Sequence, residues 1–198
     1  MILGITGGTG SGKSTLLQLI AARGGNVLDC DAIYHRLLET DTKLLSAIED
    51  RFPGVVNHGV LDRKKLGGIV FADKNALQDL NRITHAAVRQ EVLRQLVSQH
   101  SLVAIDAIGL FEGELDVLCD VTVAITAPVE LRIQRIMNRD NLSEDYARSR
   151  IEAQHEDAWF AEKCDALLEN NGTQEEFTAK CLAFLSKLGI IKENAKGE

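Results

Sequence analysis

Short apolar runs alternate with segments of helical periodicity along this chain. The runs have the length of strands and are Ile2–Thr6, Asn26–Asp31, Leu102–Asp106, Val121–Ile125 and Ala166–Glu169. Parallel strands that helices cover on both faces are apolar on both sides, and the third and fourth runs have this character. The alternation of strands and helices predicts an α/β fold, with a five-stranded parallel sheet and right-handed crossovers.

Helical periodicity fills the stretches between these strands. One helix is predicted through Leu16–Ile20, and the long stretch 32–100 is helical with mixed charge. It is clearest at Ala87–Leu96, where apolar residues recur at three- and four-residue steps. Further helices are predicted at about Pro128–Asn138, whose proline suits a first turn, and at Phe177–Leu188. No repeat, low-complexity tract or linker divides the chain, so we expect one domain over residues 1–198.

A glycine-rich stretch follows the first predicted strand. GGTGSGKS, Gly7–Ser14, fits G-x-x-x-x-G-K-[ST] at every fixed position, between a strand and a helix. Glycines let such a loop wrap a phosphate with its N–H groups pointing inward, next to the positive end of the helix. The predicted nucleotide-binding residues here are Gly10, Ser11, Gly12, Lys13, Ser14 and Thr15. Lys13 is suited to the β- and γ-phosphate oxygens and the Ser14 hydroxyl to Mg²⁺. A dinucleotide-binding G-x-G-x-x-G is excluded, because it needs a glycine where Lys13 stands.

Three carboxylates stand at predicted strand ends, where ligands of open α/β sheets collect. Asp29 and Asp31 end the second run, and strand alternation predicts that they share one face. Asp31 can orient an attacking hydroxyl and take its proton, or cap the helix that starts at Ala32, and the two roles can coexist. We interpret Asp29 as structural. Asp106 ends the third run, so it is either a Walker-B-type carboxylate that helps to hold Mg²⁺ or contacts the acceptor, or a plain strand-end residue.

Five arginines lie between Arg132 and Arg150. At 100° per residue Arg132, Arg135 and Arg139 share a narrow arc of the predicted helix, beside an apolar stripe of Val129, Ile133, Ile136 and Met137. These arginines form either a solvated face or a mobile cover that neutralises charge on a transferred phosphoryl group and excludes water. Ser143 follows in a polar turn and suits the start of a further helix.

Composition narrows the classes of partner. With 29 acidic and 22 basic residues the net charge is −7, which argues against a protein that coats nucleic acid or an anionic membrane.

No run approaches the roughly 20 apolar residues of a membrane span, and the chain opens on a strand and not on a signal peptide. Its 4 cysteines are widely spaced without C-x-x-C, so neither zinc nor a redox dithiol is indicated. We expect a cytoplasmic protein with reduced thiols. The sequence does not define the oligomeric state, and a monomer is the simplest expectation.

Further short segments complete a recognisable series. They are Gly4–Ser14, Asp29-Cys30-Asp31 with His35, Leu61-Asp62-Arg63 with Leu66 and Phe71, Ile83-Thr84-His85 with Arg89, Leu110-Phe111-Glu112, Arg135–Asp140, Gln154, and Asn170-Asn171-Gly172. In order and spacing these segments resemble the dephospho-coenzyme A kinase family, over nearly the whole chain. After the glycine loop no single segment is specific, and the series as a whole carries the resemblance.

The resemblance implies a P-loop nucleoside-phosphate-kinase-like, three-layer fold. Its core would comprise about residues 1–31, 101–127 and 164–198, with a helical acceptor region at about 32–100 and an arginine lid at about 128–163. It implies ATP-dependent phosphorylation of the ribose 3′-hydroxyl of dephospho-coenzyme A, with ATP and Mg²⁺.

The family's site residues carry over onto this sequence one by one. Asp31 is the implied base, and Lys13, Arg135 and Arg139 would stabilise the transferring phosphoryl group. Asn170 and Gly172 fall near the adenine of ATP. The implied acceptor-binding residues are Asp31, Arg63, His85, Arg89, Phe111 and Glu112.

The chain departs from the family pattern on the acceptor side. It has Ile108-Gly109-Leu110 where the family usually has Pro-Leu-Leu, and His85-Ala86 where the family usually has His-Pro. A related kinase of a nucleoside or a shikimate-like alcohol, and a non-catalytic nucleotide sensor, are the alternatives. A GTPase is disfavoured, because the sequence has no N-K-x-D or T-K-x-D guanine motif.

Overall fold

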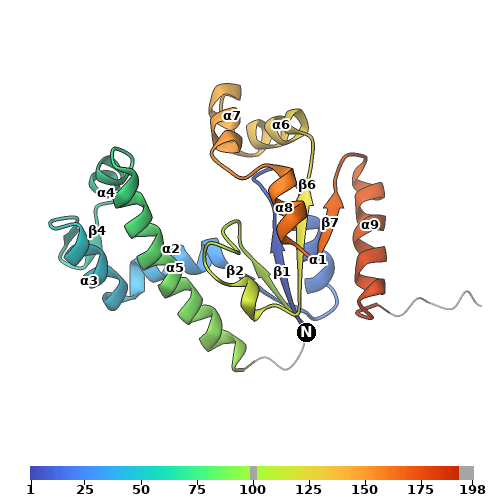
Figure 1. Ribbon diagram of the computed structural model, residues 1–198, viewed down its shortest axis with the longest axis horizontal. Helices are drawn as coiled ribbons and strands as arrows, with labels where there is room; N and C mark the ends of the chain where they lie inside the picture. Colours follow the sequence, from blue (N-terminus) through green and yellow to red (C-terminus); the bar gives the residue numbers. More distant parts are fainter. Residues whose placement is uncertain (99–101, 192–198) are drawn as a thin grey trace, which may run out of the picture. The chain divides into compact units, whose positions relative to one another are not determined.

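The computed structural model describes residues 1–98 and 102–191, which form two compact units (Figure 1). The first unit takes the described residues within Met1–Val27, Ser101–Ile108 and Cys119–Glu198, and the second those within Leu28–His100 and Gly109–Leu118. The predicted helical stretch ends at residue 100 and the predicted core at 198, so both reach beyond the described residues. The acceptor region and lid expected from the sequence stay predictions.

The first unit holds most of a five-stranded sheet with strand order β2-β5-β1-β6-β7. β1 pairs in parallel with β5 and β6, and β6 in parallel with β7. This confirms the predicted α/β fold. The elements of the unit are β1 (Ile2–Thr6), α1 (Lys13–Ala21), β5 (Val103–Asp106), β6 (Val121–Thr126), α6 (Val129–Asp140), α7 (Glu144–Glu152), α8 (Asp157–Lys163), β7 (Ala166–Glu169) and α9 (Gln174–Lys187), and β2 (Asn26–Asp29) spans the boundary of the two units.

The core of this unit lies where α1 and α9 cover one face of the sheet. Leu3 and Ile5 of β1, Leu16 of α1 and Leu185 of α9 are fully buried in one cluster, with Phe177 beside them. Burial of these side chains is the main favourable contribution to folding. The glycine loop joins β1 directly to α1, so this packing fixes both ends of the loop.

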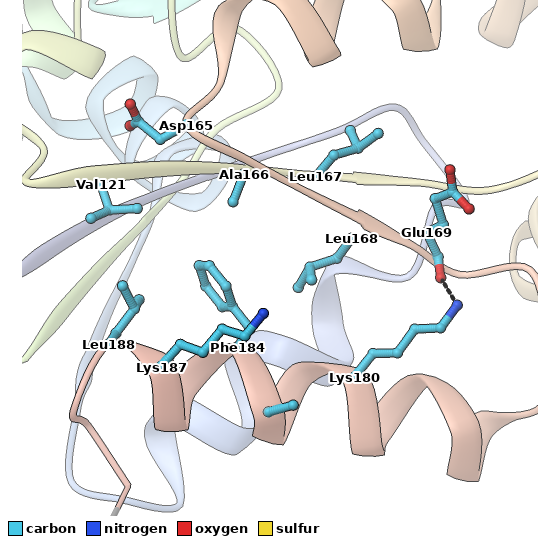
Figure 2. A pocket seen from close by; sticks show the side chains of 11 residues that line it. Val121, Asp165, Ala166, Leu167, Leu168, Glu169, Lys180, Phe184, Lys187 and Leu188 are labelled. Carbon is cyan, nitrogen blue, oxygen red and sulfur yellow. Dashed lines mark hydrogen bonds between the residues drawn. The ribbon is translucent and has the colours of Figure 1, made fainter.

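β7 is one of the two edge strands of the sheet, and a groove of about 640 Å³ runs between it and α9. Figure 2 shows Ala166 and Leu168 pointing toward α9, while Leu167 points to the other side of the sheet. Lys180 of α9 donates a hydrogen bond to the Glu169 carbonyl at 2.8 Å. No residue of the glycine loop lines this groove. The groove lies at the edge of the sheet, beside the four-residue strand β7.

α6 and α7 form a helix pair with its own small core. Ile133 and Ile136 of α6 pack against Ala147 and Ile151 of α7, and all four are buried. Ser143 caps α7 by accepting a hydrogen bond from the Tyr146 N–H, as the sequence predicts. One part of the predicted apolar stripe is wrong, because Val129 is 44% exposed, being the first residue of α6.

The second unit is helical, as predicted, with one interruption. Its elements are α2 (Cys30–Thr40), α3 (Thr42–Arg51), β3 (Val56–Asn57), β4 (Val60–Leu61), α4 (Arg63–Val70), α5 (Lys74–Leu96) and a 3₁₀ turn (Asp116–Leu118). Aspartates cap its helices: the side chains of Asp41, Asp62 and Asp73 accept backbone N–H bonds at the starts of α3, α4 and α5. Such caps satisfy donors that the first helical turn leaves without partners.

The interruption is the antiparallel hairpin of β3 and β4, in which Val56 lies opposite Leu61. His58 and Gly59, the two residues of its turn, both have positive φ, 51° and 78°. Positive φ at both central residues is required by the type I′ turn, one of the two common two-residue hairpin turns, and it favours glycine. The hairpin was missed because its strands have only two residues each.

No helix in residues 1–98 and 102–191 is both long and apolar enough to cross a membrane.

Candidate active site

The glycine loop between β1 and α1 has a backbone that side chains would disrupt. Gly12 adopts φ 101° at the start of α1, and a Cβ there would collide with the side-chain amide of Asn170. Gly10 has φ 80°, and its Cβ would lie 2.8 Å from the Arg132 carbonyl oxygen. The pattern of glycines is therefore required by close packing as well as by conformation.

Three successive carbonyls of the loop are held by donors from elsewhere in the unit. The Thr9 oxygen accepts from Arg132 Nε at 2.9 Å, and the Gly10 oxygen from Arg135 Nη1 at 3.1 Å. The Ser11 oxygen accepts from Asn170 Nδ2 at 2.8 Å and from Arg135 Nη1 at 3.2 Å. In a trans peptide the N–H points opposite to the C=O. Anchoring these carbonyls therefore turns the N–H groups of Gly10 and Gly12 the other way, as a phosphate cradle needs.

Arg132 and Gln154 clamp the loop at Thr9. Arg132 is only 4% exposed, and its Nη2 donates to Gln154 Oε1 at 2.9 Å. Gln154 Oε1 also accepts from the Thr9 N–H, and its Nε2 donates to Thr9 Oγ1, each at 2.9 Å. Burial lowers the pKa of Arg132, and the nearby Asp157 carboxylate opposes this shift. An arginine stays charged under such conditions. Arg132 therefore has a structural role. Its predicted position on the arginine arc of the helix did not indicate this role.

Lys13 lies over the loop and faces Asp106. Its Nζ donates to the Gly7 carbonyl at 3.0 Å and lies 4.0 Å from Asp106 Oδ1. Asp106 is at the end of β5, where it pairs in register with Ile5 of β1. The structure thus brings the loop lysine and the predicted Walker-B-type carboxylate together at the ends of two adjacent strands.

Ser14 and Asp106 are the residues predicted to hold Mg²⁺ beside the glycine loop. Ser14 is exposed in the first turn of α1. Asp106 is the carboxylate that forms an ion pair with Lys13. Among the described residues no group of three or more His, Cys, Asp or Glu could hold a metal ion. Mg²⁺ commonly keeps several waters and binds one or two protein ligands together with substrate phosphates. Ser14 and Asp106 fit that manner of binding.

Thr15, the last predicted residue of the loop, is turned inward. It is 8% exposed, and its hydroxyl accepts from Gln174 Nε2 at 2.9 Å. Gly172 is also packed: a Cβ there would collide with the Glu176 carboxylate, which accepts the Thr173 N–H in a capping box that starts α9. Asn170 is 2% exposed. The predicted contacts of Asn170 and Gly172 with adenine stay predictions, and both residues have structural contacts.

The three arginines of the predicted arc have different surroundings. Arg132 and Arg135 reach the glycine loop, and burial lowers the pKa of Arg135. Arg139, one turn further on, forms a two-bond ion pair with Asp140 at 2.7 and 2.9 Å, which raises the pKa of Arg139. Arg150 also contacts Asp140, at 3.3 Å. The side chain of Arg139 is 61% exposed.

The second unit corrects the prediction for Asp29 and Asp31. β2 ends at Asp29, and Asp31 lies in the first turn of α2, so strand alternation does not relate them. Asp29 is the cap of α2, accepting the Ala32 N–H at 2.9 Å, and not Asp31. The strand prediction ran two residues too far because the cap and the helix start follow the strand without a loop. Asp31 is exposed, and its side chain is not the helix cap.

Some predicted acceptor residues lie together in the second unit. His85 Nδ1 is 3.2 Å from the Glu112 carbonyl oxygen, and Arg89 Nε donates to the Glu114 carbonyl at 3.2 Å. His85, Arg89 and Glu112 line one cavity of about 490 Å³. Phe111 is adjacent in sequence but does not line this cavity, and Arg63 lines a different one.

One residue of each departure from the family pattern, Ala86 and Gly109, lies near His85 and Glu112. Ala86 lines the same cavity as this pair. A Cβ on Gly109 would lie 3.6 Å from Glu112 Oε2 and 3.8 Å from His85 Nε2, which is ordinary contact. The backbone at Gly109 therefore leaves room for a Cβ atom.

Comparison with known proteins decides the family. The family model of dephospho-CoA kinase matches residues 1–176. This chain belongs to the dephospho-CoA kinase family. It is 37% identical over 193 residues to the dephospho-CoA kinase of Anaeromyxobacter dehalogenans, an alignment that covers 94% of this chain and 92% of that one. The enzyme of the same name from Thermobifida fusca is 36% identical over 182 residues, with 90% and 91% coverage.

Solved structures agree with this assignment. Dephospho-CoA kinase from Campylobacter jejuni superimposes with a TM-score of 0.68 at 26% identity, covering 94% of this chain and 96% of that chain. A Thermus thermophilus protein matches with a TM-score of 0.79 at 34% identity, covering 95% and 97%. Shikimate kinase from Bacteroides thetaiotaomicron, at 16% identity and a TM-score of 0.54, covers 96% and 98% and shares the fold alone. The family membership thus rests on the closer matches.

Arg132→Lys tests the anchoring of the loop. An ammonium group cannot replace the planar guanidinium that joins Thr9 to Gln154. We expect the free energy of unfolding in urea to fall by about 2 kcal/mol, as when buried polar groups lose a partner, and ATP binding to weaken. Arg148→Lys is the control, because the ion pairs of Arg148 are with two exposed glutamates, Glu130 and Glu144. Unchanged stability and ATP affinity in Arg132→Lys would contradict the anchoring role.

Proposed function

We propose that this protein transfers the γ-phosphoryl group of ATP to the ribose 3′-hydroxyl of dephospho-coenzyme A, which yields coenzyme A and ADP. The observation that carries the proposal is the anchored glycine loop with Lys13 and Asp106 beside it, in a chain that matches the dephospho-CoA kinase family over residues 1–176. The loop accounts for the phosphate donor, and the family accounts for the acceptor.

On the donor side, the N–H groups of Gly10 and Gly12 would face the phosphates, and Ser14 and Asp106 would hold Mg²⁺. The metal, when bound, neutralises charge on the phosphate oxygens. Lys13 would leave the Gly7 carbonyl and place its charge on the β- and γ-oxygens. Arg139 would add charge as the phosphoryl group transfers, while Arg135 would act mainly through the loop carbonyls that it binds. Asn170 and Gly172 would lie near the adenine.

On the acceptor side, Asp31 would orient the ribose hydroxyl and accept its proton. Its exposure and its freedom from capping leave the carboxylate available for this role. His85, Arg89 and Glu112 would contact the acceptor in their shared cavity, and Arg63 and Phe111 would contact it elsewhere. We propose a cytoplasmic protein with small-molecule substrates and neither nucleic-acid nor membrane partners, and a monomer is its simplest oligomeric state.

An acceptor panel tests the function. Purified protein with Mg-ATP is offered dephospho-coenzyme A, adenosine, uridine and shikimate, and ADP release is followed for each. We expect dephospho-coenzyme A to have much the highest kcat/KM. Equal or better turnover of a nucleoside or of shikimate would overturn the proposal in favour of a related kinase, and no turnover at all would favour a nucleotide sensor.

Asp31→Asn tests the acceptor-side carboxylate. The amide cannot accept the hydroxyl proton, so we expect kcat to fall about 10²-fold, the lower end for a general base, with ATP affinity unchanged. Asp29→Asn is the matched control, because asparagine caps a helix about as well as aspartate, and it should retain near wild-type kcat. The role assigned to Asp31 fails if the folded Asp31→Asn variant turns over at the wild-type rate.

Lys13→Ala tests the donor side. Removing a charge that faces the β- and γ-oxygens should lower kcat by about 10²-fold or more, as for loss of one stabilising group in the transition state. Thermal unfolding of the variant serves as the control for folding, since Lys13 also contacts Gly7 and Asp106. Near-normal turnover by a folded variant would refute this role.

A further inference from the structure

A second cavity of the helical unit, of about 210 Å³, lies apart from the one that holds His85. Half of its lining residues are aliphatic: Leu38 of α2, Leu61 of β4, Leu66 and Val70 of α4, and Leu80 of α5. Its rim carries Tyr34, His35, Arg63 and Phe71. Phe71 is 84% exposed, an unusual setting for a phenylalanine at the mouth of an apolar cavity.

This cavity continues the face of α2 that begins with Asp31. Tyr34, His35 and Leu38 follow Asp31 at three, four and seven positions, so all four share one side of the helix. At 1.5 Å per residue the distance along the axis from Asp31 to Leu38 is about 10 Å. A molecule whose reacting hydroxyl is at Asp31 can therefore extend along this face into the cavity.

The polar rim is basic where such a molecule would pass. Arg63 lies at the start of α4, near Tyr34. Burial raises the pKa of Tyr34, and the charge of Arg63 partly offsets this rise. Arg63 is the one lysine or arginine among the residues that line the cavity. Lys64 follows it and is also exposed, but does not line the cavity. The cavity thus has a cationic entrance and an apolar interior, which suits a ligand with an anionic group followed by an apolar one.

Dephospho-coenzyme A has this order of groups. From the ribose it continues through a diphosphate to the pantetheine arm, whose second carbon bears two methyl groups. We propose that the cavity between α2, α4 and α5 binds the pantoyl end of this arm, with Arg63 and His35 at the diphosphate and Phe71 closing over the methyl groups. This inference rests on the proposed function and adds the part of the acceptor that the cavity recognises.

The adenine is the other candidate group for this cavity. An adenine would be held best between flat faces or by hydrogen bonds to its edge. The rings of Tyr34, His35 and Phe71 could offer such faces, but five branched aliphatic side chains make up the larger group in the lining. The aliphatic lining favours the methyl groups of the arm. The experiment below separates the two, because AMP contains the adenosine and lacks the arm.

Two neighbouring glycines of α4 provide a matched test. Gly67 lines the cavity, and a Cβ there would lie 3.4 Å from Phe71 Cε2; Gly68 is next to it, and a Cβ there meets nothing within 4 Å. Leucine at either position favours the helix over glycine. Gly67→Leu should fill the cavity, whereas Gly68→Leu should point into open space, so the pair separates blocking of the cavity from any effect on the helix.

Binding of dephospho-coenzyme A is measured by calorimetry, and turnover of dephospho-coenzyme A and of AMP by ADP release. We expect Gly67→Leu to weaken dephospho-coenzyme A binding about tenfold or more, the scale of losing one apolar group's contacts. AMP turnover should stay within twofold, and Gly68→Leu should match the wild type. Phe71→Ala should act in the same direction as Gly67→Leu, with Ile69→Ala, outside the cavity, as its control.

Each other outcome has a distinct meaning. Wild-type affinity of Gly67→Leu and Phe71→Ala for dephospho-coenzyme A would overturn the proposal. Equal weakening with dephospho-coenzyme A and AMP would overturn it in favour of the adenosine half. If the wild-type protein binds dephospho-coenzyme A but does not phosphorylate it, the proposed function fails, and the calorimetric comparison still decides the assignment of the cavity.

Discussion

The donor site of this protein depends on the bonds that hold the carbonyl groups of its glycine loop. A loop rich in glycine has many conformations, and its N–H groups form a phosphate cradle only when their directions are fixed. Arg132, Arg135 and Asn170 fix them by binding the oxygens of Thr9, Gly10 and Ser11. These donors come from α6 and from the residue that follows β7, more than a hundred residues away in sequence. The glycines of the motif therefore allow the loop to adopt this conformation, and the side-chain donors from the rest of the unit fix it.

Much of the sheet was predictable, because buried parallel strands have a distinct apolar pattern. Val103–Asp106 and Val121–Thr126 lie within one residue of their predicted bounds. Local signals failed where elements meet without a loop or are very short. At β2 the strand passes directly into α2, so Asp31 could be read as a strand end although it is helical. The β3–β4 hairpin is too short for a periodic pattern, and only the His58-Gly59 turn gave a signal for it.

For the site, the sequence indicated residue types, and the structure adds their contacts. The motif predicted a role for Lys13, and the structure places Lys13 beside the Gly7 carbonyl and Asp106. The helical wheel placed Arg132, Arg135 and Arg139 on one arc, but an arc does not show which neighbour each side chain meets. Arg132 is buried against Thr9 and Gln154, whereas Arg139 pairs with the adjacent Asp140. Such differences depend on tertiary packing, which no local pattern contains.

The anchoring of α6 also limits how this part of the protein can move. Arg132 and Arg135 bind the glycine loop from the first two turns of α6, and Gln154 binds it from just beyond α7. The buried contacts between α6 and α7 join these attachment points. A rotation of the whole helix pair would break the bonds that shape the loop. Mobility compatible with a shaped loop is therefore confined to the far end of α6 and the turn to α7, where Arg139 and Asp140 form a pair that solvent can replace.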